Sequence, residues 1–308
     1  MKTTIASFST QDKIANQISM DLDLWRTNID YKNFSDWWPE IHINDPQENI
    51  EWKNVFYLWD ISTQEKFFSN ISTFQAISWY YAEKINVIIP YFPVWTMERV
   101  DIEWQVATAV VMSRLFDSTP SAEWWKVKFH FFDIHDLHER FYHNDNVTFK
   151  LHTTMDLLKE QIKDIPDLAI AFPDAWAKKR FSKDFKWYDI IECSKERDWD
   201  NRIIRIVEGN SSWKNIIIID DLIQSGTTLI NCADELRNLW AKSVSAYVPH
   251  AVCPNDSHIK VANSFDTFYT TNTIPDRKEK FAWINNIEVF NMIDLYKEII
   301  NREIGFLK

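Results

Sequence analysis

Residues 215–230 read NIIIIDDLIQSGTTLI, and this stretch decides the fold. Its aliphatic run, 216–219, is apolar on both faces, which is typical of a parallel strand buried in the middle of a sheet. A short polar loop follows, and an apolar helical pattern begins at residue 228. A strand, a loop and a helix in this order indicate an α/β fold, and open α/β sheets bind their ligands at the carboxyl ends of the strands.

The loop between this strand and this helix carries groups suited to a phosphorylated sugar. A helix N-terminus offers free N–H groups and the positive end of the helix dipole to a phosphate. Hydroxyl side chains add donors, and a glycine lets the backbone approach closely. Two adjacent carboxylates suit sugar hydroxyls or Mg²⁺. The alternative is an ordinary strand–turn–helix with an acidic N-cap. The candidate residues are Asp220, Asp221, Ser225, Gly226, Thr227 and Thr228.

Composition narrows the class of protein. The net charge of −11 argues against a nucleic-acid-binding surface, which would need a basic patch. We expect no membrane partner, since no apolar run approaches membrane-spanning length and no signal sequence opens the chain. Cys193, Cys232 and Cys253 lack metal or disulfide spacing and fit a reducing compartment. These features predict a cytoplasmic enzyme.

Strand and helix patterns alternate along the chain, which predicts an α/β fold of mainly parallel sheets flanked by helices. The length suits two domains, and we place them at 1–148 and 149–308, with the option that the last helix packs back on the first domain. The segment 267–282 is polar and is expected to be a loop. Strands are predicted at 55–58, 87–92, 127–132, 168–172, 190–193, 203–207, 216–219 and 244–248, and helices at 64–83, 103–116, 154–163, 228–239 and 293–301.

Glycine and tryptophan occur in abnormal proportion, with 3 glycines against 16 tryptophans. Several tryptophans stand where chain geometry favours glycine. Trp52 and Trp213 each precede Lys-Asn and an apolar strand, and Trp240 follows the helical pattern that ends at residue 239. Some bacterial lineages read the codon UGA as glycine and others as tryptophan. We therefore hypothesise that many of these positions are glycines misread as tryptophan. The alternative is a genuinely tryptophan-rich protein.

Further candidate residues follow other predicted strands. His135 comes just beyond 127–132, where it could reach a metal or phosphate, although a lone histidine is more often structural. Asp174 follows 168–172 and is either a ligand or a helix N-cap. Lys195 and Arg197, two residues apart on an extended segment, could grip a polyphosphate or belong to a solvated hairpin.

Two stretches in the first half of the chain combine aromatic and charged residues. Arg99 ends the stretch YFPVWTMER at 91–99 and could serve an anionic or aromatic ligand. Phe34 and Asp36 form an aromatic–acid pair within FSDWWP at 34–39. Neither stretch is specific by itself.

The order and spacing of these motifs resemble the ribose-phosphate diphosphokinase (5-phosphoribosyl-1-pyrophosphate, or PRPP, synthetase) family over essentially the whole chain. DDLIQSG at 220–226 resembles the PRPP signature of the type I phosphoribosyltransferase fold. FSDWWP and FPVWTMER at 92–99 resemble Phe-x-Asp-Gly-Trp-Pro and Phe-Pro-x-Gly-Thr-x-Glu-Arg of the plant-like, phosphate-independent class. Trp37 and Trp95 then stand in glycine places, and Trp38 is a true tryptophan. Thr227 departs from the pattern, because the family usually has a second glycine there. FDIH at 132–135, ERFY at 139–142, FPD at 172–174 and SAYV at 245–248 complete the match.

The resemblance implies two type I phosphoribosyltransferase-like domains, the first on the ATP side and the second carrying the ribose 5-phosphate loop. It implies transfer of the diphosphoryl group of ATP to the C1 hydroxyl of ribose 5-phosphate. The six residues of the 220–228 loop then bind ribose 5-phosphate, and Lys195 and Arg197 are catalytic. The implied Mg²⁺ ligands are His135, Asp174 and Asp220, and the implied ATP-binding residues are Phe34, Asp36, Arg99 and His135.

The resemblance also implies a homo-oligomer in which Phe34 and Asp36 reach the ATP site of a neighbouring subunit. Two rival functions fit the same fold. A nucleobase phosphoribosyltransferase would need only the 220–228 loop, and a non-catalytic regulatory protein would keep the fold without the activity.

Overall fold

The structure is a computed structural model that describes residues 2–94, 97, 100, 102–117, 125–134, 147–198 and 201–305, with the backbone only at 195–198 and 201–203. The chain forms two compact units, Met1–His152 with Met292–Lys308 and Thr153–Asn291. The boundary expected between 148 and 149 falls inside strand β8 (Val147–His152), which pairs with β7 (Val127–Phe132) of the first unit. Within the described residues, no helix is both long and apolar enough to cross a bilayer.

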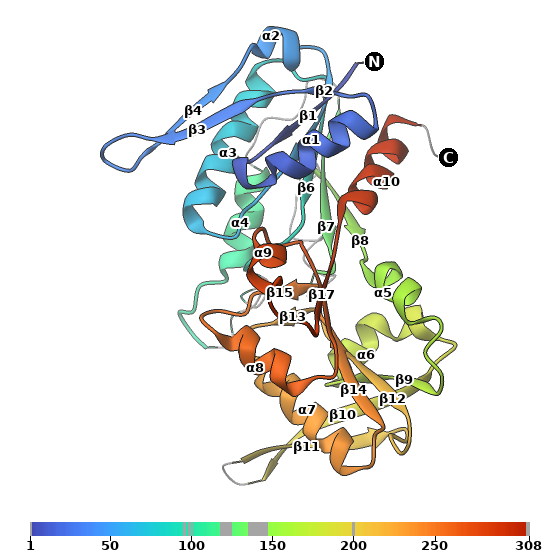
Figure 1. The fold of residues 1–308 in the computed structure, drawn as a ribbon. Coiled ribbons are helices and arrows are strands. Elements are labelled where there is room, and N and C mark those ends of the chain that lie inside the picture. Colours follow the sequence, from blue (N-terminus) through green and yellow to red (C-terminus); the bar gives the residue numbers. More distant parts are fainter. Residues whose placement is uncertain are drawn as a thin grey trace. The chain divides into compact units, whose positions relative to one another are not determined.

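The first unit is built on a six-stranded parallel sheet (Figure 1). Helices cover both of its faces. Phe74 of α3 and Phe116 of α4 pack in one hydrophobic cluster with strand residues, whereas Tyr296 of α10 packs against Phe132 from the other side. The strands run in the order β2 (Trp25–Arg26), β1 (Thr3–Ser7), β5 (Asn54–Leu58), β6 (Lys84–Ile89), β7 and β8, and the helices are α1 (Asp12–Asp21), α2 (Pro46–Asn49), α3 (Gln64–Trp79), α4 (Thr108–Asp117) and α10 (Ile293–Ile304).

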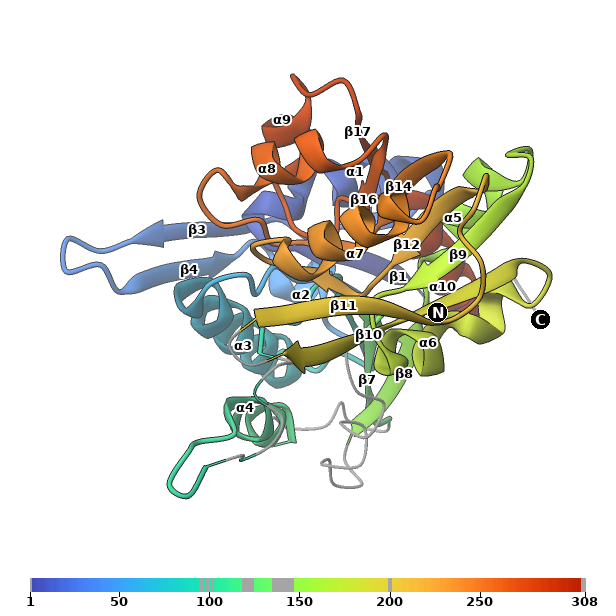
Figure 2. The same ribbon diagram turned by 90° about the horizontal axis from the view of Figure 1, so that it is seen from below.

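An antiparallel hairpin projects from this unit (Figures 1 and 2). It consists of β3 (Ile29–Asn33) and β4 (Pro39–Ile43), with residues 34–38 at its tip. Its base is anchored in the core, because Ile29 and Ile43 face each other and are both buried. The tip therefore stands clear of the sheet that carries it.

The second unit contains a seven-stranded sheet that is parallel except for its β10–β11 edge. A small parallel pair, β13 (Leu222–Ile223) with β15 (His250–Ala251), lies beside it. The main sheet runs in the order β11 (Asn201–Glu208), β10 (Asp189–Asp198), β9 (Leu168–Phe172), β12 (Asn215–Ile219), β14 (Ser243–Tyr247), β16 (Phe268–Thr271) and β17 (Ile287–Phe290). The helices are α5 (Met155–Ile162), α6 (Ala175–Phe181), α7 (Thr227–Asn238), α8 (Ser257–Ser264) and α9 (Arg277–Phe281).

The position of β12 in the middle of the sheet explains why its sequence is apolar on both faces. It pairs in parallel with β9 on one side and β14 on the other. Ile216 and Ile218 pack into a cluster with α7, whereas Ile217 and Ile219 pack into a second cluster with α5 and α6. All four isoleucines are buried, so the prediction of a parallel strand that is apolar on both faces is confirmed.

Two predictions of local structure are wrong. The segment 267–282 is not a loop, since it contains β16 and the short helix α9. Its threonines look polar in the sequence, yet Thr270 and Thr271 are buried and their hydroxyls both donate to the carbonyl of Pro249. The helix expected at 103–116 begins only at Thr108.

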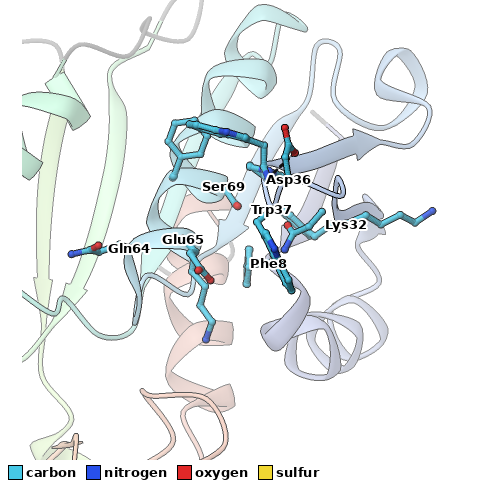
Figure 3. Close-up of a pocket in the computed structure, with 13 residues that line it drawn as sticks. Phe8, Lys32, Asp36, Trp37, Gln64, Glu65 and Ser69 are labelled. Atoms are coloured by element: carbon cyan, nitrogen blue, oxygen red, sulfur yellow. Dashed lines mark hydrogen bonds between the residues drawn. The ribbon is translucent and has the colours of Figure 1, made fainter.

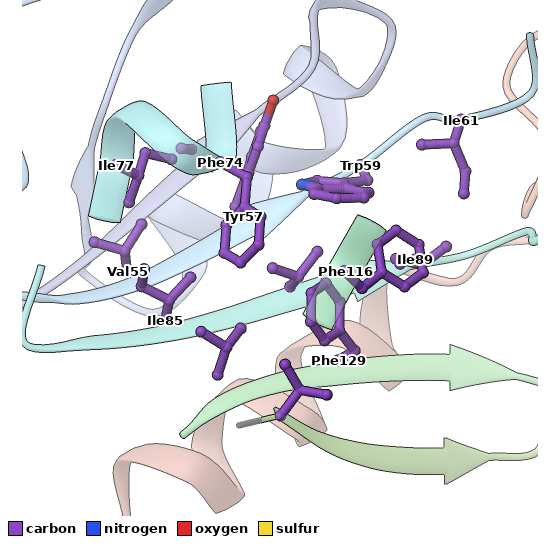
Figure 4. Close-up of a cluster of buried hydrophobic side chains, with 14 of the residues drawn as sticks. Val55, Tyr57, Trp59, Ile61, Phe74, Ile77, Ile85, Ile89, Phe116 and Phe129 are labelled. Atoms are coloured by element: carbon purple, nitrogen blue, oxygen red, sulfur yellow. The ribbon is translucent and has the colours of Figure 1, made fainter. Parts of the chain in front are cut away.

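The tryptophans divide sharply by burial. Among the described ones, Trp59 alone is buried, and its ring makes edge contacts with Tyr57, Phe74, Phe116 and Phe129 (Figure 4). The remaining twelve are exposed: Trp25, Trp37, Trp38, Trp52, Trp79, Trp104, Trp125, Trp176, Trp187, Trp213, Trp240 and Trp283. Exposed apolar rings in this number lie outside the normal pattern of a globular protein surface.

Candidate functional site

The carboxylates of Asp220 and Asp221 lie at the carboxyl end of β12, where the sheet leaves room for a ligand. The main chain holds them there, because the Asp220 amide donates to the carbonyl of Tyr247 at 3.2 Å. The Asp221 amide donates to Oδ1 of Asp220 at 3.0 Å. Asp221 is buried, and Asp220 is partly exposed. The pair therefore combines one partly exposed acid with one buried acid.

The loop after these acids ends at the N-terminus of α7. Gly226 is the N-cap and has a left-handed backbone with φ of 76°. A Cβ on Gly226 would lie 2.9 Å from Cγ2 of Val261, so both backbone and packing require glycine. The hydroxyls of Ser225 and Thr227 lie 3.2 Å apart, and both residues are exposed. First-turn amides and two hydroxyls thus converge where a phosphate could bind.

A second layer of main-chain hydrogen bonds supports this loop. The amides of Val252 and Cys253 both donate to the carbonyl of Ile223, at 3.0 and 3.3 Å. The Ser257 hydroxyl donates to the carbonyl of Gln224 at 3.3 Å. The segment between β15 and α8 therefore fixes the start of the loop at 224–226.

Asp174 is the N-cap of α6, which was one of the two alternatives for it. Its Oδ1 accepts hydrogen bonds from the amides of Trp176 and Ala177, at 3.2 and 3.1 Å. Besides capping α6, Asp174 lies close enough to Asp220 for its charge to act on that carboxylate. Burial, and then the negative charges of Asp221 and Asp174, raise the pKa of Asp220 well above its usual range. The two neighbouring carboxylates thus oppose the ionisation of Asp220 at this end of the sheet.

A cation would relieve that repulsion, and oxygen donors of this kind suit Mg²⁺. In the part of the chain that the structure describes, no three carboxylate, histidine or cysteine side chains are grouped as a complete metal site. Mg²⁺ commonly uses only one or two carboxylates together with water and substrate phosphates. The donor type of Asp220 and Asp174 therefore fits the ion.

Lys195 and Arg197 lie on β10, in the part that continues beyond the sheet. β10 pairs with β9 only as far as Glu192. Its pairing with β11 shifts register between Glu192 and Cys193, and beyond that point β10 pairs with β11 alone. In backbone register, Lys195 pairs with Ile204 and Arg197 pairs with Arg202. Figure 2 shows the antiparallel β10–β11 ribbon to which they belong.

Phe34 and Asp36 lie at the tip of the β3–β4 hairpin in the first unit. Phe34 is 54% exposed. The tip is closed by hydrogen bonds from the Phe34 amide to the Trp38 carbonyl and from the Trp37 amide to the Phe34 carbonyl. Arg99 and His135 lie outside the described residues.

A pocket of about 700 Å³ lies between this hairpin and the start of α3 (Figure 3). Asp36, Lys32 and Trp37 line it from the hairpin, and Lys66 and Ser69 line it from α3. The sequence does not reveal this pocket, because its two walls are more than twenty residues apart in the chain. Part of one wall is the ring of Trp37, so the shape of the pocket depends on which residue occupies position 37.

Comparison with known proteins places the chain in a family. The family model for the N-terminal domain of ribose phosphate pyrophosphokinase matches residues 3–119. Ribose-phosphate pyrophosphokinase 4 of Oryza sativa subsp. japonica is 35% identical over 259 residues, which cover 80% of this chain and 79% of the relative. The mitochondrial ribose-phosphate pyrophosphokinase 3 of Spinacia oleracea is 36% identical over 233 residues, 75% of this chain and 57% of the relative. The chain thus spans little more than half of the spinach protein.

The fold agrees with these matches. The crystal structure of phosphoribosylpyrophosphate synthetase from Mycobacterium smegmatis resembles this structure with a TM-score of 0.85, at 17% sequence identity and with full coverage of both chains. The two mainly parallel sheets of this chain, flanked by helices, have the type I phosphoribosyltransferase fold, as predicted. The chain therefore belongs to the ribose-phosphate pyrophosphokinase family, also called the ribose-phosphate diphosphokinase family.

Proposed function

We propose that this protein transfers the β,γ-diphosphoryl group of ATP to the C1 hydroxyl of ribose 5-phosphate. The C1 oxygen forms a bond to the β-phosphorus, the bond from that phosphorus to the bridging oxygen of AMP breaks, and the hydroxyl proton is released. The products are PRPP and AMP. The observation that carries the proposal is the carboxylate pair Asp220–Asp221 at the end of β12, followed by the left-handed Gly226 at the N-terminus of α7.

Ribose 5-phosphate would bind along this strand end and loop. Its phosphate would accept hydrogen bonds from the first-turn amides of α7 and from the hydroxyls of Ser225, Thr227 and Thr228. Asp220 and Asp221 would accept hydrogen bonds from the 2′- and 3′-hydroxyls of the sugar. These contacts would present the C1 hydroxyl in a fixed position, and positioning supplies much of the catalysis in phosphoryl-type transfers.

The remaining roles concern the charge of ATP. Lys195 and Arg197, on strand β10 of the β10–β11 ribbon, would neutralise negative charge that develops on the transferring group. Phe34 and Asp36 would bind the nucleotide in a neighbouring subunit of a homo-oligomer, because they sit at the tip of a projecting hairpin. Arg99 and His135 would complete the nucleotide site.

Mg²⁺ would bind ATP and the carboxylates of Asp220 and Asp174, with His135 as a further ligand. When bound, the ion neutralises phosphate charge. Burial and the neighbouring carboxylates raise the pKa of Asp220, and these carboxylates support this assignment, because a bound cation would relieve their repulsion. We place the reaction in the cytoplasm, because the composition fits a reducing compartment.

The test measures AMP release from ATP and Mg²⁺ with and without ribose 5-phosphate. Release that depends on ribose 5-phosphate is the expected result, and Asp221→Asn should abolish most of it. Asp164→Asn, an exposed change on the same unit, should leave it intact. Consumption of PRPP with a free nucleobase, without AMP release, would favour the phosphoribosyltransferase instead. A folded protein with neither activity would be the regulatory protein.

A further inference from the structure

Side chains of the short helix α9 donate hydrogen bonds to residues 251–253, the segment that holds the phosphate-binding loop. Arg277, near its start, donates from Nε to the carbonyl of Ala251 at 2.7 Å and from Nη2 to the carbonyl of Val252 at 3.0 Å. Lys280, one turn later, donates to the carbonyl of Cys253 at 3.1 Å. The two cations of α9 therefore hold three consecutive carbonyls of one segment.

That segment is the one that fixes the loop. Ala251 pairs with Ile223 in the β13–β15 ladder, and the amides of Val252 and Cys253 donate to the carbonyl of Ile223. Ile223 is followed directly by Gln224, Ser225 and Gly226. The Arg277 side chain is only 12% exposed, so its hydrogen bonds are shielded from water and strong. A continuous path of hydrogen bonds thus runs from α9 to the start of the loop.

We propose that Arg277 is a positioning residue for the ribose 5-phosphate loop. It touches no part of the loop and acts through residues 251–253. This inference rests on the proposed function, since it assigns ribose 5-phosphate to the loop. A shift of the segment would misplace the loop amides, and small misplacements of binding groups are costly.

The test compares Arg277→Gln and Arg277→Lys with Arg237→Gln. Arg237 is a matched control, because it also donates to a main-chain carbonyl, that of Ser264 at 2.9 Å, but lies at the far end of α7 from the loop. Arg277→Gln should raise the KM for ribose 5-phosphate roughly tenfold, the effect of about 1.4 kcal/mol. The KM for ATP should stay constant, and Arg277→Lys should recover part of the loss.

Equal changes in both KM values, or the same effect from Arg237→Gln, would overturn the positioning role. A wild-type chain without ribose 5-phosphate-dependent AMP release would instead overturn the proposed function. Direct binding of ribose 5-phosphate, measured by calorimetry on the same variants, separates these two outcomes.

A second inference comes from an independent observation about the backbone. Five exposed tryptophans have positive φ: Trp37 (69°), Trp52 (56°), Trp104 (70°), Trp213 (60°) and Trp240 (66°). A side chain at positive φ is strained by contact between its Cβ and the backbone. Most of the other residues with positive φ in the described part are aspartate or asparagine, which tolerate this conformation.

Three of these tryptophans occupy the same position in the same kind of turn. The amides of Lys53, Gln105 and Lys214 donate to the carbonyls of Ile50, Ile102 and Ser211, each three residues earlier. Trp52, Trp104 and Trp213 are the third residues of these turns. Positive φ at the third position of a turn is a glycine requirement.

The other two have equally specific surroundings. After α7, the amide of Trp240 donates to the carbonyl of Arg237, and the amide of Ala241 donates to the carbonyl of Leu236. This is the Schellman pattern, with Trp240 at the C′ position that glycine normally fills. Phe34 and Trp38 close a three-residue hairpin loop, and Trp37 is the last residue of that loop. In hairpin loops of this length, the residue after the turn adopts the left-handed conformation.

We infer that the native protein carries glycine at positions 37, 52, 104, 213 and 240, where UGA has been read as tryptophan. Trp59 is excluded from this group, because it fills the core between Phe74, Phe116 and Phe129. The structure therefore narrows the hypothesis from the sequence and sets Trp59 apart as a genuine tryptophan.

The decisive test is the mass of peptides from the native source that cover 211–241. Glycine at 213 and 240 is expected, and tryptophan at either would overturn the inference. A second test compares thermal unfolding of the chain with a variant carrying glycine at all five positions. The midpoint should rise, whereas Trp59→Gly should lower it.

Trp187→Gly is the matched control, because Trp187 is 95% exposed and does not have positive φ. It removes an exposed ring without relieving strain. A five-glycine variant that gains no more per site than Trp187→Gly would contradict the inference.

Discussion

The imidazole rings of His130 and His152 stack in the first unit, with Nδ1 of His130 3.0 Å from Nε2 of His152. Nε2 of His130 lies 3.4 Å from Oδ1 of Asn86, whose amide donates to Asn54 at 2.9 Å. A consistent set of donors makes both histidines neutral, with His152 donating to His130 and His130 donating to Asn86. Protonation of His130 at Nδ1 would remove the acceptor for His152 and break this chain, and protonation of His152 would place a charge in a largely buried environment.

This pair predicts a loss of stability in acid. Burial lowers the pKa of His130 well below its usual range, and burial, followed by the charge of Arg302, lowers the pKa of His152 to about 4. The unfolded chain takes up protons near pH 6.5, whereas the folded protein does not. Stability is therefore full above about pH 6.5 and falls as the pH drops toward about 4, by on the order of 3 kcal/mol for His152.

Urea unfolding at pH 7 and pH 4.5 checks this prediction. His152→Gln should lose less stability over this range than the wild type. His42→Gln, at an exposed histidine, should behave as the wild type does. An identical pH dependence in all three proteins would contradict the prediction.

Lys195→Ala should reduce turnover by roughly 10²–10³, the usual effect of removing one preorganised donor to developing charge. Binding of ribose 5-phosphate should persist, because the loop that would hold it is intact. Steady-state AMP release and calorimetry measure the two effects. Lys186→Ala, at an exposed lysine of the same unit, is the control, and near-normal turnover in Lys195→Ala would reject the catalytic role.

Gly226→Ala and Gly305→Ala form a matched pair. Both glycines have positive φ, 76° and 85°, but a Cβ would collide with Val261 only at Gly226 and would meet nothing within 4 Å at Gly305. We expect Gly305→Ala to cost about 1–2 kcal/mol of strain. Gly226→Ala should cost about 1–3 kcal/mol more and weaken ribose 5-phosphate binding. Thermal unfolding and ligand titration would show equal effects if the packing at Gly226 were unimportant.

The exposed hairpin tip predicts complementation between subunits. Phe34→Ala and Lys195→Ala homo-oligomers should each be nearly inactive. After dissociation and mixing, hybrids should regain AMP release, because intact tips from one kind of subunit would serve intact loops of the other. A mixture of Phe34→Ala with Asp36→Ala should not recover, since both changes affect the tip. Recovery in neither mixture would place Phe34 in its own subunit's site.

Asp220→Asn should stabilise the protein in the absence of divalent metal while it impairs function. The pKa of Asp220 is raised by burial and by neighbouring carboxylates, so its charge opposes folding at neutral pH. The thermal midpoint in EDTA should rise, and the increase that Mg²⁺ gives the wild type should shrink. Asp164→Asn should change neither quantity. An unchanged response to Mg²⁺ would remove Asp220 from the metal site.

The elements best predicted from the sequence are those whose own apolar pattern indicates what they pack against. The strand 216–219 is one, since a run that is apolar on both faces fits only the middle of a covered sheet. The strand 168–172 is predictable for the same reason, since all five of its residues are apolar and buried. The helix after the acidic pair was also predicted, because its apolar periodicity follows the loop directly in the chain, and α7 begins at Thr227.

The errors came from residues whose environment is set by distant segments. The threonines of 270–273 look like a loop, but Thr271 and Thr273 donate to Pro249 inside the protein. The β3–β4 hairpin was also missed, although Tyr31 and Ile41 alternate with exposed residues beside the buried pair Ile29 and Ile43; each strand is only five residues long.

The sequence by itself determined the α/β class, the family, and the order of strand, acidic pair, loop and helix at 215–238, because these depend on neighbours along the chain. Only the tertiary structure decided that Arg277 reaches the segment behind the loop, and that Asp174 adds its charge to that of Asp220. It also decided which tryptophans are strained and which one fills the core. Those properties arise from φ angles and contacts across long sequence separations, which a linear pattern does not encode.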